Sequence, residues 1–210
     1  MLPAFKESFL DDIYLRGFPQ SVLKKKNLKV IDIGANVGFF SLYMFYQFLN
    51  ARVLAFEPIP YNFGVLEQYQ KRFKDFDFHI FPKAVGGKNE KITLNASKLD
   101  GYTTMASVFE SSKKGHQIEV EALSLDTVFD QHQLKQIDLL KLDCEGAEYD
   151  IIYNASEETL NNISMMSIET HQGVQKDENL QSLQVFLKKK GFQLSALDEG
   201  NTGYLWAWKV

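Results

Sequence analysis

Two glycines and an acid form the most informative stretch of the chain. Asp32 lies in the apolar run of residues 30–33, and Gly34 and Gly38 follow with three residues between them. Gly34 can adopt a backbone shape that a side chain forbids, which lets a ligand approach closely. The helix expected beyond it offers unpaired N–H groups in its first turn. Dinucleotide-binding turns have the spacing G-x-G-x-x-G, and Asp32 would repel a pyrophosphate. The stretch therefore favours a cofactor that has a cationic end and no phosphate.

A second acid, Glu57, supports a nucleoside ligand. It closes the apolar run of residues 52–56, precedes Pro58 and lies nineteen residues after Gly38. An acid at this distance, at the tip of the next strand, hydrogen-bonds the ribose hydroxyls of a bound nucleotide. S-adenosylmethionine (SAM) fits both acids because it carries an ammonium, a sulfonium and an adenosine. A ligand-free turn at the glycines and a helix cap at Glu57 are the alternative interpretations.

Four more acids and bases follow two later apolar runs. Asp143 and Glu145 come after residues 137–142, and Glu169 and His171 close the run that begins at residue 165. In open α/β sheets, ligands bind beyond the carboxyl ends of the strands, where the strand order reverses. We expect these four side chains to converge on the methionine end of the cofactor.

The surrounding pattern of strands and helices would place these residues. Strands are expected at residues 29–33, 53–56, 78–81, 137–142 and 165–169, with helices at 37–49, 61–73, 147–154 and 179–190. The end of the chain, 192–197 and 204–210, reads as a hairpin. This order predicts an α/β, Rossmann-like fold whose sheet is mostly parallel with an antiparallel C-terminal strand. We expect a single domain over residues 1–210, with residues 1–28 as an N-terminal helical extension.

Residues 86–136 interrupt the alternation between the third and fourth strands. Residues 91–95 and 118–122 alternate apolar with polar side chains, as a half-exposed strand pair does. A connection as long as residues 98–117 is usually a functional lid or a disordered segment, and we favour a lid. We therefore predict a β insertion with a lid on the acceptor side. The lid residues that could contact an acceptor are Tyr102, Thr103, Thr104, Ser107 and Phe109.

Several segments together resemble the FkbM family of SAM-dependent methyltransferases. They are IDIGANVG at 31–38, FEP at 56–58, LSLD at 123–126, IDLLKLDCEGAE at 137–148 and IETH at 168–171. The resemblance implies a class I methyltransferase that acts mainly on hydroxyl groups of sugars, glycolipids or polyketide-like metabolites. It also implies SAM contacts at Asp32, Gly34, Gly38 and Glu57, with Asp143 close to the reaction centre. The expected cofactor site further includes Asn36, Phe39, Pro58 and Ala84.

Methyl transfer to an alcohol benefits from a base, because an alkyl alcohol is about as weak an acid as water, with a pKa of roughly 15.7. His171 is the best candidate, since its ordinary pKa near 6.5 leaves it largely neutral in a cell. A histidine that is merely hydrogen-bonded at a strand end is the alternative. Asp143 could orient the acceptor hydroxyl or take its proton, and Glu145 is a third candidate. These donors also suit Mg or Mn, but no spacing is diagnostic, so we expect no metal.

Two other functions fit the cofactor turn less well. A nicotinamide-dependent oxidoreductase would need a glycine at Asn36 and a Tyr-x-x-x-Lys acid, which the chain lacks. A non-catalytic adenosine-binding module would not need the polar cluster at the far end of the site.

The net charge and the cysteine content limit the classes of partner and the compartment that we expect for this chain. The formal net charge of -4, with acids and bases interspersed, gives no case for nucleic acid. The lone Cys144 and the absence of a signal peptide or membrane span favour the cytoplasm. We expect a small-molecule or glycan acceptor, and nothing in the sequence indicates the oligomeric state.

Overall fold

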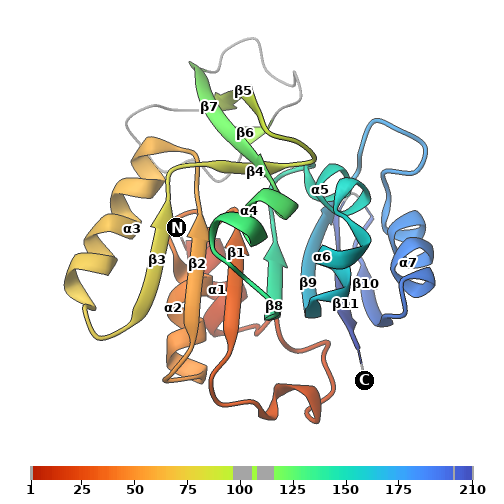
Figure 1. Ribbon diagram of the computed structural model, residues 1–210, viewed down its shortest axis with the longest axis horizontal. Helices are drawn as coiled ribbons and strands as arrows, with labels where there is room; N and C mark the ends of the chain where they lie inside the picture. The colour runs from red at the N-terminus through yellow and green to blue at the C-terminus, as the bar shows by residue number, and fades with distance from the viewer. Residues whose placement is uncertain (1, 97–105, 108–115, 201, 210) are drawn as a thin grey trace.

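The computed structural model describes the chain except for residues 1, 97–105, 108–115, 201 and 210 (Figure 1). Its main sheet has seven strands in the order β10-β11-β9-β8-β1-β2-β3. The strands are β1 (Lys29–Ile33), β2 (Arg52–Phe56), β3 (Asp77–Phe81), β8 (Ile137–Leu142), β9 (Ile163–His171), β10 (Gln193–Asp198) and β11 (Thr202–Trp208).

The central strands are parallel and apolar. β1 lies between β2 and β8, and β8 pairs in parallel with β9. All six residues of β8 are buried, as expected for a strand covered on both faces. β11 runs antiparallel to both β9 and β10. The predicted mostly parallel sheet with an antiparallel C-terminal strand is thus confirmed, and the carboxyl ends of β1, β2, β8 and β9 meet at one edge.

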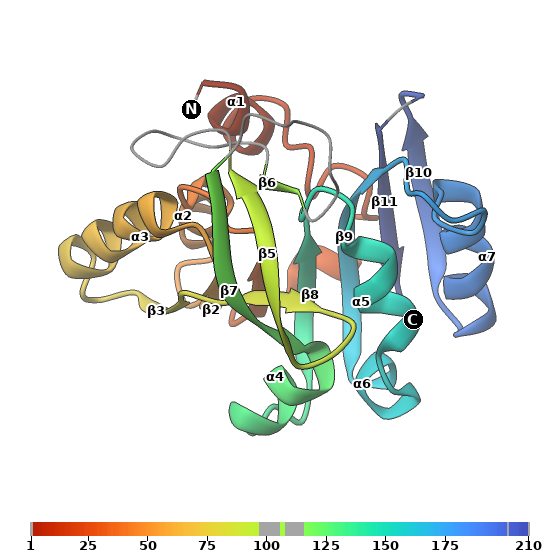
Figure 2. The same ribbon diagram turned by 90° about the horizontal axis from the view of Figure 1, so that it is seen from above.

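Helices cover both faces of this sheet (Figure 2). They are α1 (Leu2–Phe9), α2 (Phe39–Gln47), α3 (Pro60–Arg72), α4 (Leu125–Gln131), α5 (Glu148–Asn154), α6 (Glu157–Asn161) and α7 (Leu180–Lys189), with a short 3-10 turn, η1 (Val22–Lys24). One core cluster joins the sheet to α2 and to residues 13–18, and a second joins it to α4, α5, α6 and α7. A third, smaller cluster lies in the second sheet and includes Leu94, Val120 and Ala122. Among the described residues, no helix is long and apolar enough to cross a membrane.

The predicted β insertion is a second sheet. It contains β4 (Ala84–Gly86), β5 (Glu90–Ala96), β6 (Ala106–Ser107) and β7 (His116–Ser124), in the order β4-β7-β5-β6. Figure 1 shows it above the carboxyl edge of the main sheet. β5 and β7 are antiparallel partners, as the alternating pattern predicted. The parallel pairing of β4 with β7 was not predicted from the sequence.

The predicted lid falls almost entirely outside the described residues. This applies to Tyr102, Thr103, Thr104 and Phe109, while Ser107 ends the two-residue strand β6. The last two residues of the predicted lid, 116 and 117, begin β7 instead. The proposed contact of the lid with an acceptor therefore stays a prediction.

Two boundaries near the site differ from the sequence prediction. α2 begins at Phe39 instead of residue 37, because Gly38 has a left-handed φ of 81° and interrupts the helical backbone. β9 continues to His171, because β11 pairs with its residues 165–171, from Thr202 opposite His171 to Trp208 opposite Met165. His171 is consequently held within a strand.

Candidate active site

A cavity of about 320 Å³ opens at the carboxyl edge of the main sheet. Its walls come from three parts of the chain: the strand tips, the second sheet and α1. Of the predicted site residues, the cavity is lined by Gly34, Asn36, Glu57, Pro58, Ala84, Asp143 and Glu145. Four others, Asp32, Gly38, Phe39 and His171, are not among its lining residues.

Glu57 is anchored at the tip of β2 by backbone groups. Its Oε2 accepts the Asn36 N–H at 2.8 Å, and its Oε1 accepts the Ile59 N–H at 2.8 Å. The residue is 4% exposed, and burial raises the pKa of its carboxyl to about 7 although both hydrogen bonds favour the charged form. The Asn62 side chain also hydrogen-bonds this carboxylate, and an ionised carboxylate, with about four acceptor sites, keeps capacity for a ligand hydroxyl. Glu57 therefore both caps the turn and faces the cavity.

The two glycines serve close packing of the chain. A side chain at Gly34, whose φ is 71°, would lie 1.8 Å from the Asp143 carbonyl oxygen. One at Gly38 would lie 2.6 Å from Leu66 Cδ2. Gly34 therefore lets the tips of β1 and β8 approach each other beneath the cavity, whereas Gly38 seats α2 against α3.

Asp32 lies in the core and does not line the cavity. It is completely buried, accepts a 2.6 Å hydrogen bond from Ser41 Oγ and pairs with Lys141 Nζ at 3.2 Å. Lys141 also donates to the Gly34 carbonyl at 2.8 Å and lies 3.5 Å from Asp143 Oδ2. Burial lowers the pKa of Lys141, but the charges of Asp32 and Asp143 outweigh it and raise the pKa overall. The lysine thus links the glycine turn to the tip of β8.

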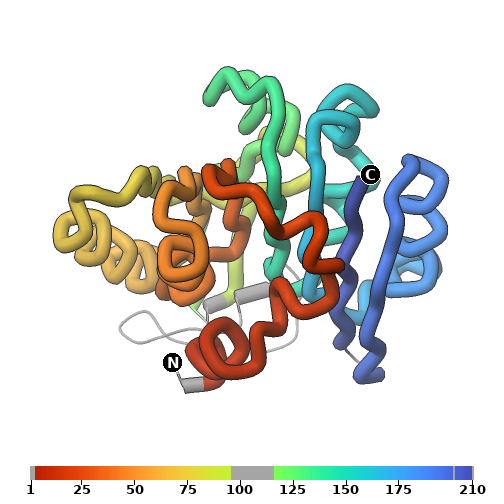
Figure 3. The backbone as a smooth tube through the Cα atoms, turned by 90° about the horizontal axis from the view of Figure 1, so that it is seen from below, coloured from red at the N-terminus to blue at the C-terminus, as the bar shows by residue number. Residues whose placement is uncertain are grey.

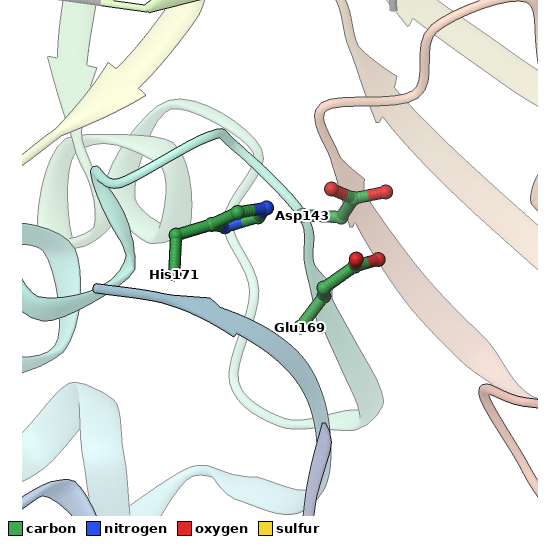
Figure 4. Close-up of side chains that lie close together, drawn as sticks. All are labelled: Asp143, Glu169 and His171. Atoms are coloured by element: carbon green, nitrogen blue, oxygen red, sulfur yellow. The ribbon is translucent and has the colours of Figure 1, made fainter. Parts of the chain in front are cut away.

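Three side chains converge at the tips of β8 and β9 (Figure 4). Asp143, Glu169 and His171 each offer a ligand atom, and these atoms lie within 4.8 Å of one another. Each also has its own partner in the chain: Tyr14 donates to Asp143 at 3.0 Å, Tyr204 donates to Glu169 at 3.3 Å, and Glu148 pairs with His171. The spacing would admit a divalent cation, but these partners account for the group without one. We therefore do not assign it as a metal centre.

The surroundings of His171 raise its pKa above the ordinary value on which its prediction as a neutral base rested. Its Nδ1 lies 3.2 Å from Glu148 Oε1, and its Nε2 lies 3.6 Å from Glu145 Oε2. Burial lowers the pKa of His171, but its hydrogen bond to Glu148 and the charges of Glu148, Glu145 and Asp143 outweigh burial and raise the pKa to about 9. The ring lines a second, polar cavity of about 290 Å³ with Thr170 and Gln172.

The turn after β8 fixes Glu145 beside this histidine. Glu148 is buried and accepts the N–H groups of Cys144 and Gly146 at 2.9 and 3.0 Å. Glu145 takes a left-handed φ of 54°, and burial raises the pKa of its carboxyl to about 7. Burial and the charge of Asp143 likewise raise the pKa of Glu169 to about 8. Several carboxyl groups at this end therefore titrate near neutral pH.

The sequence analysis missed three contributors to the site. Glu7 lines the cavity from α1, and Tyr14 and Tyr204 hold Asp143 and Glu169. Glu7 and Tyr14 lie in residues 1–28, where no recognisable motif singles them out. Tyr204 belongs to the predicted final hairpin, and an antiparallel strand beside β9 is the one sequence signal that could have found it.

Comparison with known proteins decides the family. The family model described as the methyltransferase FkbM domain matches residues 32–194. The chain belongs to the FkbM methyltransferase family. This confirms the resemblance, and with it SAM as the cofactor.

Two relatives in this family show how far the sequence likeness extends. Methyltransferase sdnD of Sordaria araneosa is 26% identical over 225 residues, which cover 91% of this chain and 82% of that protein. The 31-O-demethyl-FK506 methyltransferase FkbM of Streptomyces tacrolimicus is 25% identical over 220 residues, with coverages of 91% and 82%. Almost the whole chain therefore aligns with named methyltransferases.

Solved structures share the fold at low sequence identity. Methyltransferase FkbM of Methylobacillus flagellatus KT aligns with a TM-score of 0.65 and 15% identity over 96% of this chain, which spans only 47% of that longer one. The magnesium protoporphyrin IX methyltransferase of Synechocystis PCC 6803, solved with bound SAM, has a TM-score of 0.53 and 11% identity, with coverages of 100% and 82%. These likenesses establish the fold, a Rossmann-like methyltransferase sheet.

The cavity fits the family's cofactor. A nucleoside requires a hydrogen-bonding group for its ribose and an apolar wall for its base. Glu57 supplies the first, while Pro58, Ile59 and Val85 supply apolar surface beside it. The acids near Asp143, at the other end, suit a cationic sulfonium.

Proposed function

We propose that the chain transfers a methyl group from SAM to a hydroxyl of a sugar, glycolipid or polyketide-like metabolite. The observation that carries this proposal is that Asp143, Glu145 and Glu169 line the cavity from the tips of β8 and β9, whereas Glu57 lines it from the tip of β2, on the other side of β1. SAM supplies the methyl group as an electrophile on a cationic sulfur. Carboxylates facing that position suit a neutral nucleophile that must lose a proton as it attacks.

We place the adenosine at the tips of β1 and β2. Glu57 accepts the ribose hydroxyls, while Asn36 and Pro58 border the ribose and Ala84 of β4 lies on the second-sheet side. Asp32, Gly38 and Phe39 support this end without lining the cavity. The argument rests on Glu57, whose two oxygens are fixed by backbone N–H groups before any ligand binds. Such preorganisation reduces the entropy lost on binding.

Glu145 is the carboxylate best matched to accept the acceptor's proton. A general base works best when its pKa lies near the operating pH, and the pKa of Glu145 is about 7. Asp143 orients the hydroxyl from the tip of β8. His171 holds Glu145 by charge, and it can serve as the base itself only above its own pKa of about 9.

We further propose a small-molecule or glycan acceptor, with no nucleic acid, and a cytoplasmic location. The net charge of -4 argues against an electrostatic partner such as nucleic acid. The single cysteine, Cys144, is free and partly buried, as is usual in a reducing compartment.

The proposal is tested with isotopically labelled SAM and a panel of methyl glycosides, a glycolipid and a hydroxylated macrolactone, with and without a chelator. We expect label in a product that survives mild alkaline hydrolysis, as a methyl ether does and a methyl ester does not. Label on nitrogen or on a carboxylate would contradict hydroxyl methylation. Activity that disappears with chelator and returns with Mg or Mn would contradict the metal-free mechanism.

A further inference from the structure

Residues 2–18 precede the segment matched by the family model, which begins at residue 32, yet they reach the cavity. Figure 3 shows this segment, in red, running from α1 across the sheet toward β1. Pro3, Ala4 and Glu7 of α1 line the cavity. One wall of the site therefore comes from residues that lie outside the segment matched by the family model.

The segment is fixed to the domain by buried contacts. Trp206 Nε1 donates to the Ile13 carbonyl at 3.0 Å, and a side chain at Gly17 would lie 2.0 Å from the Trp206 ring. α1 packs its aromatic rings on α2, with 5.6 Å between the centroids of Phe5 and Phe39. These contacts hold α1 in place beside the cavity.

Tyr14 controls the position of Asp143. Its side chain is buried, and its hydroxyl donates to Asp143 Oδ2 at 3.0 Å. Lys141 Nζ lies 3.5 Å from the same oxygen, and 5.4 Å from the centre of the Tyr14 ring. The carboxylate is thus held between a tyrosine from the N-terminal segment and a lysine from β8. Without the Tyr14 hydroxyl, Lys141 alone would hold the Asp143 carboxylate. The carboxylate would then move toward the buried lysine and away from the reacting end of the cavity.

Glu7 adds a carboxyl group to the same end. Burial raises its pKa, and the charge of Asp143 raises it further. Glu7 in turn is one of the charges that raise the pKa of Glu145 and of Glu169. Groups that affect one another in this way lie within electrostatic range. A cation placed among them would be attracted by all four carboxyl groups.

We propose that the N-terminal segment supplies two residues to the active site: Tyr14 positions Asp143, and Glu7 faces the transferring methyl group. Both stabilise the sulfonium of SAM relative to the uncharged sulfur of the product, S-adenosylhomocysteine (SAH). The proposal rests on the cofactor placement given above. The N-terminal segment then provides part of the enzyme's preference for SAM over SAH.

SAM and SAH are the probes, since they differ by one methyl group and one positive charge. The ratio of their dissociation constants, measured by calorimetry at pH 8, reports how strongly the site stabilises a positive charge on the sulfur. Glu7→Gln should reduce the preference for SAM roughly tenfold, as expected for one unit charge at close range in a site of intermediate dielectric. Tyr14→Phe, which keeps the ring, should reduce it in the same direction by a smaller factor.

Two matched controls separate this role from a structural one. Tyr43→Phe also removes a tyrosine hydroxyl that ties the N-terminal segment to the domain, through Asp12 at 2.7 Å, but it lies away from Asp143. Lys6→Gln neutralises the exposed neighbour of Glu7 on α1. Neither should lower the SAM-to-SAH preference.

The outcomes are distinct. Equal ratios in Tyr14→Phe and Tyr43→Phe, together with no change in Glu7→Gln, would overturn the inference. Should Tyr14→Phe fail to fold, Glu7→Gln alone decides, because Glu7 is only partly buried. Failure of the unaltered protein to bind either compound would instead contradict the cofactor placement.

Discussion

The two ends of the cavity are built by different means. At the adenosine end, Glu57 is fixed by backbone N–H groups of Asn36 and Ile59. At the reacting end, Asp143 is fixed by the side chains of Tyr14 and Lys141, which come from distant parts of the chain. The first end depends on local backbone shape. The second depends on a balance of charges and should respond to single substitutions and to pH.

The largest effect is expected from Lys141, the cation beneath the reacting end. Lys141→Met leaves Asp32 buried without its countercharge, and breaking a buried ion pair in this way typically costs about 3–5 kcal/mol of folding stability. Denaturant unfolding measures the loss. Lys88→Met is the control: its pair with Glu90 is exposed on both sides, so it should cost at most about 1 kcal/mol. Equal stability of the two variants would show that Lys141 does not stabilise the fold by compensating the charge of Asp32.

At the adenosine end we expect a loss of binding. Glu57→Ala removes charge-assisted hydrogen bonds to ribose, each worth about 1.5–3 kcal/mol, so SAH affinity should fall by one or more orders of magnitude. The fold should persist, as circular dichroism and the melting temperature will show. Unchanged SAH affinity in the folded variant would reduce Glu57 to a cap for the turns at Asn36 and Ile59.

The smallest effect is a shift in pH dependence at the reacting end. If Glu145 is the base, kcat should rise with pH around 7, where its carboxyl loses a proton. The charge of His171 lowers the pKa of Glu145, although burial raises it more. His171→Ala should therefore move the midpoint to higher pH and lower kcat more than it weakens SAH binding. A wild-type midpoint near 9 would identify His171 as the base, and near-normal kcat in the variant would remove it from the mechanism.

Sequence periodicity anticipated the fold well because strands buried on both faces produce short apolar runs. The predicted runs at 29–33 and 137–142 coincide with β1 and β8. The cofactor turn was equally readable, since Gly34 and Glu57 act through the local backbone. Helix starts were less accurate: the left-handed Gly38 moved the start of α2 to Phe39.

The reacting end could be predicted only in part. The expected strand ends placed Asp143 and His171 together, but the pKa of His171 depends on contacts across the chain. The proton on His171 is held by Glu148, which a left-handed turn at Glu145 and Gly146 brings beneath it. Tyr14 meets Asp143 across 129 positions of sequence. No local pattern encodes such a contact, so Tyr14 and Glu7 became visible only in the fold.

A structure of the protein with SAH bound tests the central claim most directly, namely that Glu57 and Asp143 mark opposite ends of one cofactor cavity. We expect the ribose hydroxyls within hydrogen-bond distance of Glu57, and the sulfur at the end bordered by Asp143, Glu145 and Glu169. A ribose bound away from Glu57, or a sulfur pointing away from Asp143, would contradict the account.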